Sequence, residues 1–219
     1  MTDLVLFGSG GFAREVLQVA LDINRDSGRW NVLGFLDDDP DAVGRAIQGY
    51  PVLGGREWLR GRTSVHVTVA IGGTVAKRRV AQRLREVGDA PFATLVHPLA
   101  WVGRHVAVGE GSVLCAGTRV TTDVRLGRHA TLNLNCTVGH DAVLDDFVTA
   151  APGVHVSGGV HVGEGCDLGT GSAIIQGTSV GEWSVVGAGA VVVRDLPANV
   201  TAVGAPARPI KERPSGWHR

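Results

Sequence analysis

The second half of the chain carries an aliphatic side chain at every sixth residue without interruption. Sixteen positions share this spacing, and all but one hold valine, leucine or isoleucine. They are Val102, Val108, Leu114, Val120, Leu126, Leu132, Val138, Leu144, Ala150, Val156, Val162, Leu168, Ile174, Val180, Val186 and Val192. A fixed period over so many residues indicates stacked structural repeats rather than chance alternation in a β-rich domain. It predicts a left-handed parallel β-helix of hexapeptide repeats, with three hexads in each coil.

Three hexads per coil place each residue beside the residue eighteen positions away. The aliphatic side chains then fill a triangular prism and stack at about the 4.8 Å spacing of neighbouring strands. The fourth residue after each aliphatic, as at Ser112 and Thr118, is small or β-branched and suits the narrow interior. Glycine often follows the aliphatic directly, as at Gly109 and Gly139. We expect these glycines to supply the special backbone angles of the corners.

Length, charge and cysteine content exclude several classes of function. The chain has 219 residues, enough for one large or two modest domains, and its 21 Lys and Arg residues balance 21 Asp and Glu residues. This balance indicates no surface for nucleic acid or an anionic membrane, and no apolar run is long enough to span a bilayer. The N-terminus has no signal-peptide pattern. Cys136 and Cys166 occupy interior positions, which predicts buried thiols in a reducing cytoplasm rather than a disulfide or a metal site.

The first 97 residues have a different pattern, in which strands alternate with helices. Apolar runs predict strands at residues 3–7, 32–36, 65–71 and 93–96. Helical spacing follows at residues 12–24 and again after Thr74, which we expect to cap the second helix. The inward face of that helix would hold Ala76, Val80, Leu84 and Val87. We therefore expect a small Rossmann-like parallel sheet over 1–97, the β-helix over 98–196 and a tail over 197–219.

A glycine cluster follows the first predicted strand. Gly8, Gly10 and Gly11 would let backbone N–H groups approach a phosphate at the start of the next helix. Asp37 and Asp38 end the second strand, where a carboxylate can accept hydrogen bonds from a ribose or a base. The match to a dinucleotide fingerprint is loose, so a simple tight turn between strand and helix stays open as the alternative.

His140 is the strongest candidate for a chemical role in the repeat. It stands two residues after Val138, which places it at a corner of the prism, and Asp141 follows it directly. A neutral imidazole can accept a proton at neutral pH, and a carboxylate beside it can fix its tautomer. The spacing alone leaves open a surface histidine beside a surface aspartate. No two histidines in the repeat lie eighteen residues apart, so a zinc site would have to assemble between subunits.

Six segments occur together in an order typical of one enzyme family. They are residues 6–11, 34–38, 70–72, 95–98, 133–141 and 204–208. On these segments the chain resembles, from residue 3 to 211, the bacterial sugar acetyltransferases of the sialic-acid O-acetyltransferase type. Within that group it is most similar to the N-acetyltransferases that act on nucleotide-linked amino sugars in bacillosamine and perosamine pathways.

The resemblance implies roles for individual residues of the β-helix. It places the general base at His140, its carboxylate partner at Asp141 and an active-site asparagine near the amino sugar at Asn133. Relatives have glutamate at the partner position, so the shorter aspartate leaves that contact in question. The backbone N–H that meets the thioester carbonyl corresponds to Gly158. Because Gly158 follows His140 by eighteen residues, the hexad geometry independently places the two side by side.

The resemblance also implies where the cofactor and the nucleotide would bind. Thr149 replaces a family histidine that contacts the cofactor, so this contact is lost or changed. Further cofactor contacts correspond to Thr170, Ala188, Ala205 and Arg208. The nucleotide would lie against the glycines named above and Gly72, with Asp37 and Asp38 reading the ribose or base.

The function implied is an acetyl-CoA-dependent N-acetyltransferase that modifies a nucleotide-linked amino sugar without a metal. The resemblance implies a homotrimer with acetyl-CoA between neighbouring β-helices. The charge balance and the cysteines described above predict a cytoplasmic protein with no nucleic-acid or membrane partner. Two alternatives remain open at this point. One is O-acetylation of a sugar hydroxyl, as in sialic acid or another polysaccharide precursor. The other is a non-catalytic scaffold or a metal-dependent hydratase.

Overall fold

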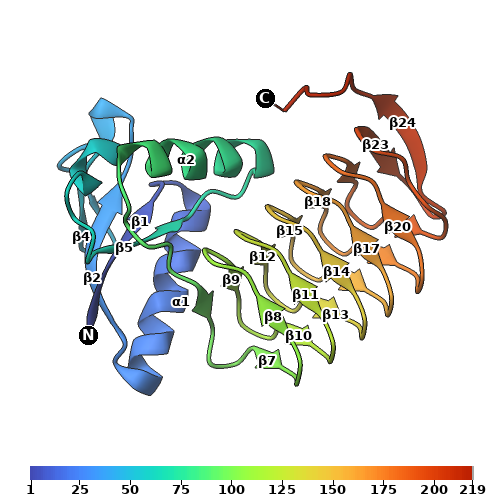
Figure 1. Ribbon diagram of the computed structural model, residues 1–219, viewed down its shortest axis with the longest axis horizontal. Helices are drawn as coiled ribbons and strands as arrows, with labels where there is room; N and C mark the ends of the chain where they lie inside the picture. The colour runs from blue at the N-terminus through green and yellow to red at the C-terminus, as the bar shows by residue number, and fades with distance from the viewer. Residues whose placement is uncertain (219) are drawn as a thin grey trace.

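The computed structural model describes residues 1–218, which form an α/β domain joined to a triangular prism (Figure 1). The α/β sheet has the strand order β3-β4-β2-β1-β5. Its strands are β1 (Thr2–Phe7), β2 (Trp30–Leu36), β3 (Ala46–Ile47), β4 (Tyr50–Gly54) and β5 (His66–Val69). All neighbours are parallel except β3 and β4, which form an antiparallel hairpin.

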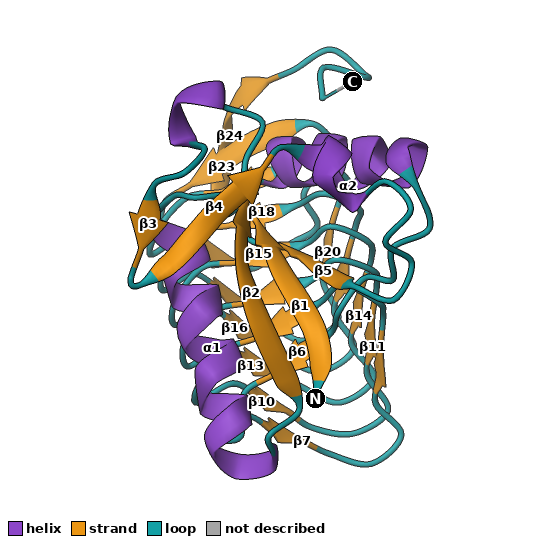
Figure 2. Cartoon of the chain, turned by 90° about the vertical axis from the view of Figure 1, so that its left-hand side faces the viewer, coloured by secondary structure: helices purple, strands orange, loops and turns teal. Residues whose placement is uncertain are grey.

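Two helices cover opposite faces of this sheet, as Figure 2 shows. They are α1 (Gly11–Ser27) and α2 (Thr74–Val87); two short 3₁₀ helices are η1 (Pro40–Ala42) and η2 (Arg56–Leu59). Successive side chains of a strand point to opposite faces. Leu4 and Leu6 of β1 therefore pack with α1, whereas Val5 and Phe7 pack with α2. None of the helices within residues 1–218 is long and apolar enough to cross a membrane.

The second helix, α2, differs from its sequence prediction in its N-cap residue and in which of its residues face inward. Gly73 precedes the helix and no side chain caps it, while Thr74 is buried in the first turn. The residues buried along α2 are Thr74, Lys77, Ala81, Leu84 and Val87, and Ala76 is exposed. A lysine at an inward position shifts the apparent apolar stripe, because hydrophobic periodicity counts lysine as a surface residue. The hairpin of β3 and β4 was also not predicted.

The hexad prediction is confirmed strand by strand. Sixteen two-residue strands, β7 to β22, each end on one of the sixteen six-spaced positions. Their bounds are Trp101–Val102, Ala107–Val108, Val113–Leu114, Arg119–Val120, Arg125–Leu126, Thr131–Leu132, Thr137–Val138, Val143–Leu144, Thr149–Ala150, His155–Val156, His161–Val162, Asp167–Leu168, Ala173–Ile174, Ser179–Val180, Val185–Val186 and Val191–Val192. Each strand pairs in parallel with the strand eighteen residues away, as in Arg119 with Thr137 and Thr137 with His155. One coil of eighteen residues is called a rung below.

The rungs build three faces. The first face runs β24-β23-β21-β18-β15-β12-β9-β6, the second runs β22-β19-β16-β13-β10-β7, and the third runs β20-β17-β14-β11-β8. The six-spaced aliphatics and the small interior residues form one continuous buried core along the axis. All three cysteines are buried and unpaired.

Glycines serve two separate purposes at the corners, and the sequence prediction assigned the wrong one. Left-handed backbone occurs at the third residue after each aliphatic from His105 to Gly189, whether or not that residue is glycine. The glycine directly after the aliphatic is needed instead because the next rung packs closely against it. A Cβ at Gly109 would lie 2.5 Å from the carbonyl carbon of Gly127 in the next rung. These glycines therefore let adjacent rungs approach, and their backbone angles are ordinary.

Both ends of the prism extend beyond the expected limits. β6 (Leu95–Val96) pairs with β9, so the first face begins before residue 97 and shares a core with α1. The tail was expected to leave the repeat, but β23 (Val200–Val203) adds a parallel strand to β21. An antiparallel strand, β24 (Arg208–Glu212), then returns along β23.

A buried lysine joins the α/β domain to the prism. Lys77 of α2 is 1% exposed, and its Nζ donates hydrogen bonds to the hydroxyls of Thr149 at 2.7 Å and Thr131 at 3.0 Å on the first face. Burial lowers the pKa of Lys77 to about 7, and the nearby Asp167 carboxylate opposes this shift. Loss of solvent disfavours the charged amine more than the surrounding oxygens favour it.

This lysine predicts a gain in stability as the pH rises. The unfolded chain keeps a proton on Lys77 up to about pH 10.5, whereas the folded chain releases it from about pH 7. Folding therefore gains about 1–2 kcal/mol between pH 7 and pH 8.5, and none below pH 7. Urea midpoints across this window should rise in the native chain relative to Lys77→Met. The three buried thiols oppose the gain near and above pH 8.5, but they do so in both chains and cancel in the difference.

Candidate active site

His140 and Asp141 lie at the corner between the second and third faces, called the His140 corner. Asp141 has φ of 60°, in the left-handed region that short polar side chains tolerate better than most. Its Oδ2 lies 2.7 Å from His140 Nδ1, and both side chains are 69% exposed. Asp141 therefore reaches the imidazole of His140 although its side chain is shorter than the glutamate of relatives. Because the carboxylate accepts from Nδ1–H, Nε2 is left as the acceptor nitrogen of a neutral imidazole.

Gly158 lies one rung above His140, as the eighteen-residue spacing predicts. A Cβ at Gly158 would lie 2.6 Å from His140 Nε2, so the imidazole occupies the space that a side chain would need. The Gly159 N–H donates to the His140 carbonyl oxygen at 2.7 Å and holds the two rungs together. No acceptor within residues 1–218 receives a hydrogen bond from the Gly158 amide. The corner thus presents an accepting nitrogen beside an uncommitted N–H donor.

Three further predicted residues lie at the corner between the first and second faces, called the Asn133 corner. Asn133 follows β12, Thr170 follows β18 and Ala188 follows β21, with Thr170 and Ala188 in adjacent rungs. The side-chain oxygen of Asn133 accepts from the Leu134 N–H at 2.7 Å. Within one chain, Asn133 and His140 are thus separated by the width of a face, roughly 15–20 Å at ~3.3 Å per residue.

The turn that carries Ala205 continues the Asn133 corner at its upper end. The Val191 N–H donates to the Gly204 carbonyl oxygen at 3.0 Å, which fixes this turn above the rung of Ala188. Ala205 is exposed, and the guanidinium of Arg208 donates to the Ala207 carbonyl oxygen at 2.9 Å. These two residues therefore stand on the same edge as Thr170 and Ala188.

Thr149, which replaces the family histidine that contacts the cofactor, does not join either corner. It lies in the middle of the first face, 7% exposed, with its hydroxyl bonded to Lys77. A hydroxyl that is covered by α2 and already satisfied has no access to a ligand. Sequence comparison alone placed it at the position of a contacting histidine, and the packing of α2 over it was not foreseen.

The glycine cluster forms the edge of the α/β sheet where β1, β2 and β5 end. Gly8 has φ of 115°, and a Cβ there would lie 2.9 Å from the carbonyl oxygen of Ala70, so only glycine fits. Gly10 is the N-cap of α1 without a side-chain bond, and Gly11 is its first residue. Backbone N–H groups of the first helical turn consequently face this edge. Gly72 is exposed just after β5 and has room for a side chain.

The two acidic residues at this edge have different surroundings. Asp37 accepts a hydrogen bond from the Ser9 hydroxyl and another from the Asp39 N–H at 3.0 Å, which ties it to the glycine loop. Asp38 turns away and accepts both the backbone N–H and the guanidinium of Arg56. Asp38 therefore anchors the start of η2, and Asp37 is the carboxylate that contacts the glycine loop.

Two arginines beside this edge were not found by sequence reasoning. Arg14 of α1 and Arg45 before β3 line a cavity of about 320 Å³ together with Ser9. Positive side chains next to a helix N-terminus suit a phosphorylated ligand. Arg14 could have been suspected from its place in the first turn of α1, but Arg45 depends on the unpredicted hairpin.

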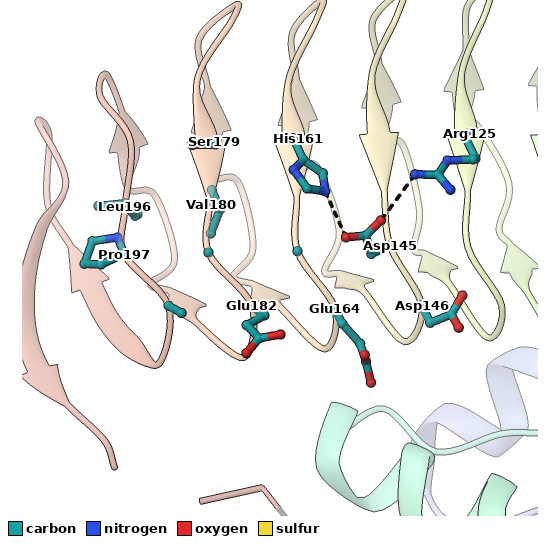
Figure 3. Close-up of a pocket in the computed structure, with 13 residues that line it drawn as sticks. Arg125, Asp145, Asp146, His161, Glu164, Ser179, Val180, Glu182, Leu196 and Pro197 are labelled. Carbon is teal, nitrogen blue, oxygen red and sulfur yellow. Dashed lines mark hydrogen bonds and ion pairs between the residues drawn. The ribbon is translucent and has the colours of Figure 1, made fainter. Parts of the chain in front are cut away.

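A larger cavity of about 640 Å³ lies at the remaining corner, between the third and first faces (Figure 3). Asp145 bonds to His161 at 2.8 Å and pairs with Arg125 at 3.6 Å, as the dashed lines mark. Asp146, Glu164 and Glu182 also line this cavity. Such an acidic lining repels phosphorylated ligands, and none of the predicted site residues lies here.

Two other chemistries lack support in the part of the chain that is described. Within residues 1–218 no three His, Cys, Asp or Glu side chains gather as a metal site would require. Burial raises the pKa of Cys136 to about 11 and that of Cys166 to about 12, so neither thiol is a ready nucleophile.

Comparison with known proteins gives the same pairing of domains. Residues 3–84 match the family described as PglD N-terminal domain. GDP-perosamine N-acetyltransferase of Escherichia coli is 30% identical over 155 residues, which cover 70% of this chain and 69% of that protein. UDP-N-acetylbacillosamine N-acetyltransferase of Bacillus subtilis is 38% identical over 74 residues, covering 29% of this chain and 34% of that protein.

Solved structures match nearly the whole chain. A histidine-to-asparagine variant of perosamine N-acetyltransferase from Caulobacter crescentus, in complex with CoA and GDP-perosamine, is 33% identical with a TM-score of 0.87, covering 96% of this chain and 97% of that one. The acetyltransferase domain of PglB from Neisseria gonorrhoeae, in complex with acetyl coenzyme A, is 31% identical with a TM-score of 0.85, covering 95% and 99%. The chain therefore belongs to the hexapeptide-repeat sugar acetyltransferases, left-handed β-helix enzymes that take their acetyl group from acetyl-CoA.

Proposed function

We propose that the protein transfers the acetyl group of acetyl-CoA to the amino group of a nucleotide-linked amino sugar. The observation that carries the proposal is the pair formed by His140 Nε2 and the free Gly158 amide at one corner. The glycine loop with Asp37, Arg14 and Arg45 supports a phosphorylated acceptor. Relatives that act on GDP-perosamine and UDP-linked sugars support the nucleotide and the amine.

The acyl transfer needs no covalent enzyme intermediate. The sugar amine attacks the thioester carbonyl while Nε2 of His140 takes the proton that the amine loses. Asp141 stabilises the imidazolium that results, through its contact with Nδ1. The Gly158 N–H donates to the oxyanion, a contribution typically worth about 3 kcal/mol. Collapse of the tetrahedral intermediate breaks the C–S bond, and the imidazolium returns its proton to the thiolate of CoA.

We also propose that a homotrimer completes the site between protomers. The resemblance places Asn133 and His140 at one amino sugar, yet within one chain they lie on successive corners. A neighbouring prism that brings its His140 corner to the Asn133 corner would unite them. The acetyl-CoA contacts at Thr170, Ala188, Ala205 and Arg208 lie on this same edge and would line the shared cleft. We place the reaction in the cytoplasm, where unpaired cysteines such as the three here persist.

A thiol-release assay against UDP-, GDP- and CMP-linked sugars, each with an amino or a hydroxyl acceptor, tests the proposal. Turnover only with amino sugars is expected. Turnover with hydroxyl acceptors and none with amines would establish O-acetylation instead. Zinc-dependent activity without thiol release would contradict both.

His140→Ala should lower turnover by about 10²–10⁴-fold, because the amine would lose its proton acceptor. The surface location of the side chain predicts unchanged assembly and melting temperature. Steady-state kinetics and size-exclusion chromatography provide the measurement. His161→Ala is the matched control, because His161 is an exposed histidine on the third face that bonds to Asp145, away from the His140 and Asn133 corners. A fully active His140→Ala variant would remove the imidazole from the mechanism.

Gly158→Val should disable the corner by displacing the imidazole, since even a Cβ would lie 2.6 Å from Nε2. We expect a loss of kcat/KM for acetyl-CoA of about 10²-fold or more, comparable to losing one oxyanion donor and misplacing the base. Thr122→Ala, at the same corner one rung below His140, should retain activity. Equal kinetics for Gly158→Val and the native enzyme would contradict this placement of the thioester.

Asp37→Ala should raise KM for the sugar nucleotide by about tenfold or more, as expected for a lost hydrogen bond to a charged group. KM for acetyl-CoA should stay unchanged, because the α/β domain does not form the His140 corner. Asp38→Ala is the control, since its carboxylate is engaged by Arg56 and should affect stability only. The reverse result for the two variants would overturn the assignment of this edge.

A further inference from the structure

Lys77 carries an amine that is buried between α2 and the prism, where an apolar side chain would be expected. It is one of the largest fully buried side chains, and its amine reaches two threonine hydroxyls on the face of the prism. A methionine would fill the same space without the cost of burying an amine, and replacing buried polar groups by apolar ones is often neutral or stabilising. A buried lysine at a domain contact therefore calls for a reason other than stability.

The two threonines belong to the two rungs that form the proposed acyl-transfer corner. His140 lies nine residues after Thr131, and Gly158 lies nine residues after Thr149. Nine residues are half of one coil, so Thr131 lies across the prism from His140, and Thr149 lies across it from Gly158. Lys77 therefore bonds to the same two adjacent rungs that carry His140 and Gly158.

On its other side, Lys77 is connected to the nucleotide edge of the α/β domain. Its backbone N–H donates to the Gly73 carbonyl oxygen at 2.9 Å in the first turn of α2. Gly73 directly follows Gly72, at the end of β5 beside the glycine loop. One residue thus connects the edge that would hold the nucleotide to the rungs that would perform the chemistry.

We propose that Lys77 is a positioning residue that holds the N-terminal half of α2, and with it the nucleotide edge, level with the rungs of His140 and Gly158, while β6 joins the domain to the first rung. This inference rests on the proposed function.

Ala81 and Leu84 of α2 pack with the α/β sheet and with Phe147 of the prism, and apolar contacts of this kind are not directional. The ion pairs of Arg78 with Glu164 and of Arg85 with Glu110 also link α2 to the prism, but their side chains are partly exposed. Hydrogen bonds from one amine to two hydroxyls select one register, which is the best-attested use of a buried polar group.

The test compares four variants with the native enzyme. Lys77→Met removes the amine, and Thr131→Val with Thr149→Val removes the hydroxyls. The triple variant Lys77→Met, Thr131→Val, Thr149→Val removes the amine and both hydroxyls, and it is built with Asp167→Asn so that no carboxylate is left beside the contact without the amine. Lys211→Met is the matched control, because Lys211 is the only other lysine and is exposed on β24. Each variant is measured for melting temperature and for kcat/KM with a sugar nucleotide and with a small primary amine.

We expect the triple variant to recover the native melting temperature but not the native activity. Its kcat/KM for the sugar nucleotide should stay lower by on the order of 10²-fold, the effect of a shift of about 1 Å in a bound reactant. Its activity on the small amine should match the native enzyme, because that acceptor does not use the nucleotide domain. Lys211→Met should match the native enzyme in every measurement.

Two results would overturn the inference. Recovery of both stability and sugar-nucleotide activity in the triple variant would make the contact merely structural. Equal losses with the sugar nucleotide and the small amine would mean that Lys77 acts on the His140 corner itself. If the native enzyme acetylates no nucleotide sugar, the proposed function fails separately.

Hydrogen exchange tests Lys77 without any assay of activity. Amides of α2 should exchange faster in the triple variant than in the native chain at equal melting temperature, because the helix is no longer held in one register. Unchanged exchange in α2 would contradict the positioning role whatever the substrate proves to be.

Discussion

Close stacking of the rungs is the constraint on which the other features depend. The backbone of each rung bonds to the next at the eighteen-residue register, and the glycines after the aliphatics admit this approach. The same contact places the His140 imidazole against Gly158, where a side chain would collide with it. The site is therefore a property of two adjacent rungs, and its geometry follows from a spacing that is readable in the chain.

That spacing explains why the prism could be predicted almost completely. Every strand from β7 to β22 follows from the hexad pattern, because each repeat imposes the same local solution on the next. The position of His140 at a corner beside Gly158 follows as well. The left-handed backbone at each corner was predicted for the residue directly after the aliphatic, but it occurs two residues later, as at Asp141. The glycines that suggested the earlier position are there because the rungs pack closely.

The α/β domain was less predictable because tertiary contacts decide its details. Asp37 and Asp38 are neighbours of one residue type, yet one faces the glycine loop and the other is engaged by Arg56. No local pattern predicts the contact between Lys77 and Thr149, because the two residues are 72 positions apart in the sequence. The hairpin that brings Arg45 to the cavity consists of two short strands whose pairing no local pattern specified.

The eighteen-residue coil also limits how such a chain can change its length. A residue inserted inside a strand would exchange its inward and outward side chains, whereas one inserted at a corner can bulge outward. Duplication of a complete coil above Gly158 would keep all faces aligned and leave the His140 corner intact. The prism can therefore be lengthened in units of one coil without disturbing the contact between His140 and Gly158.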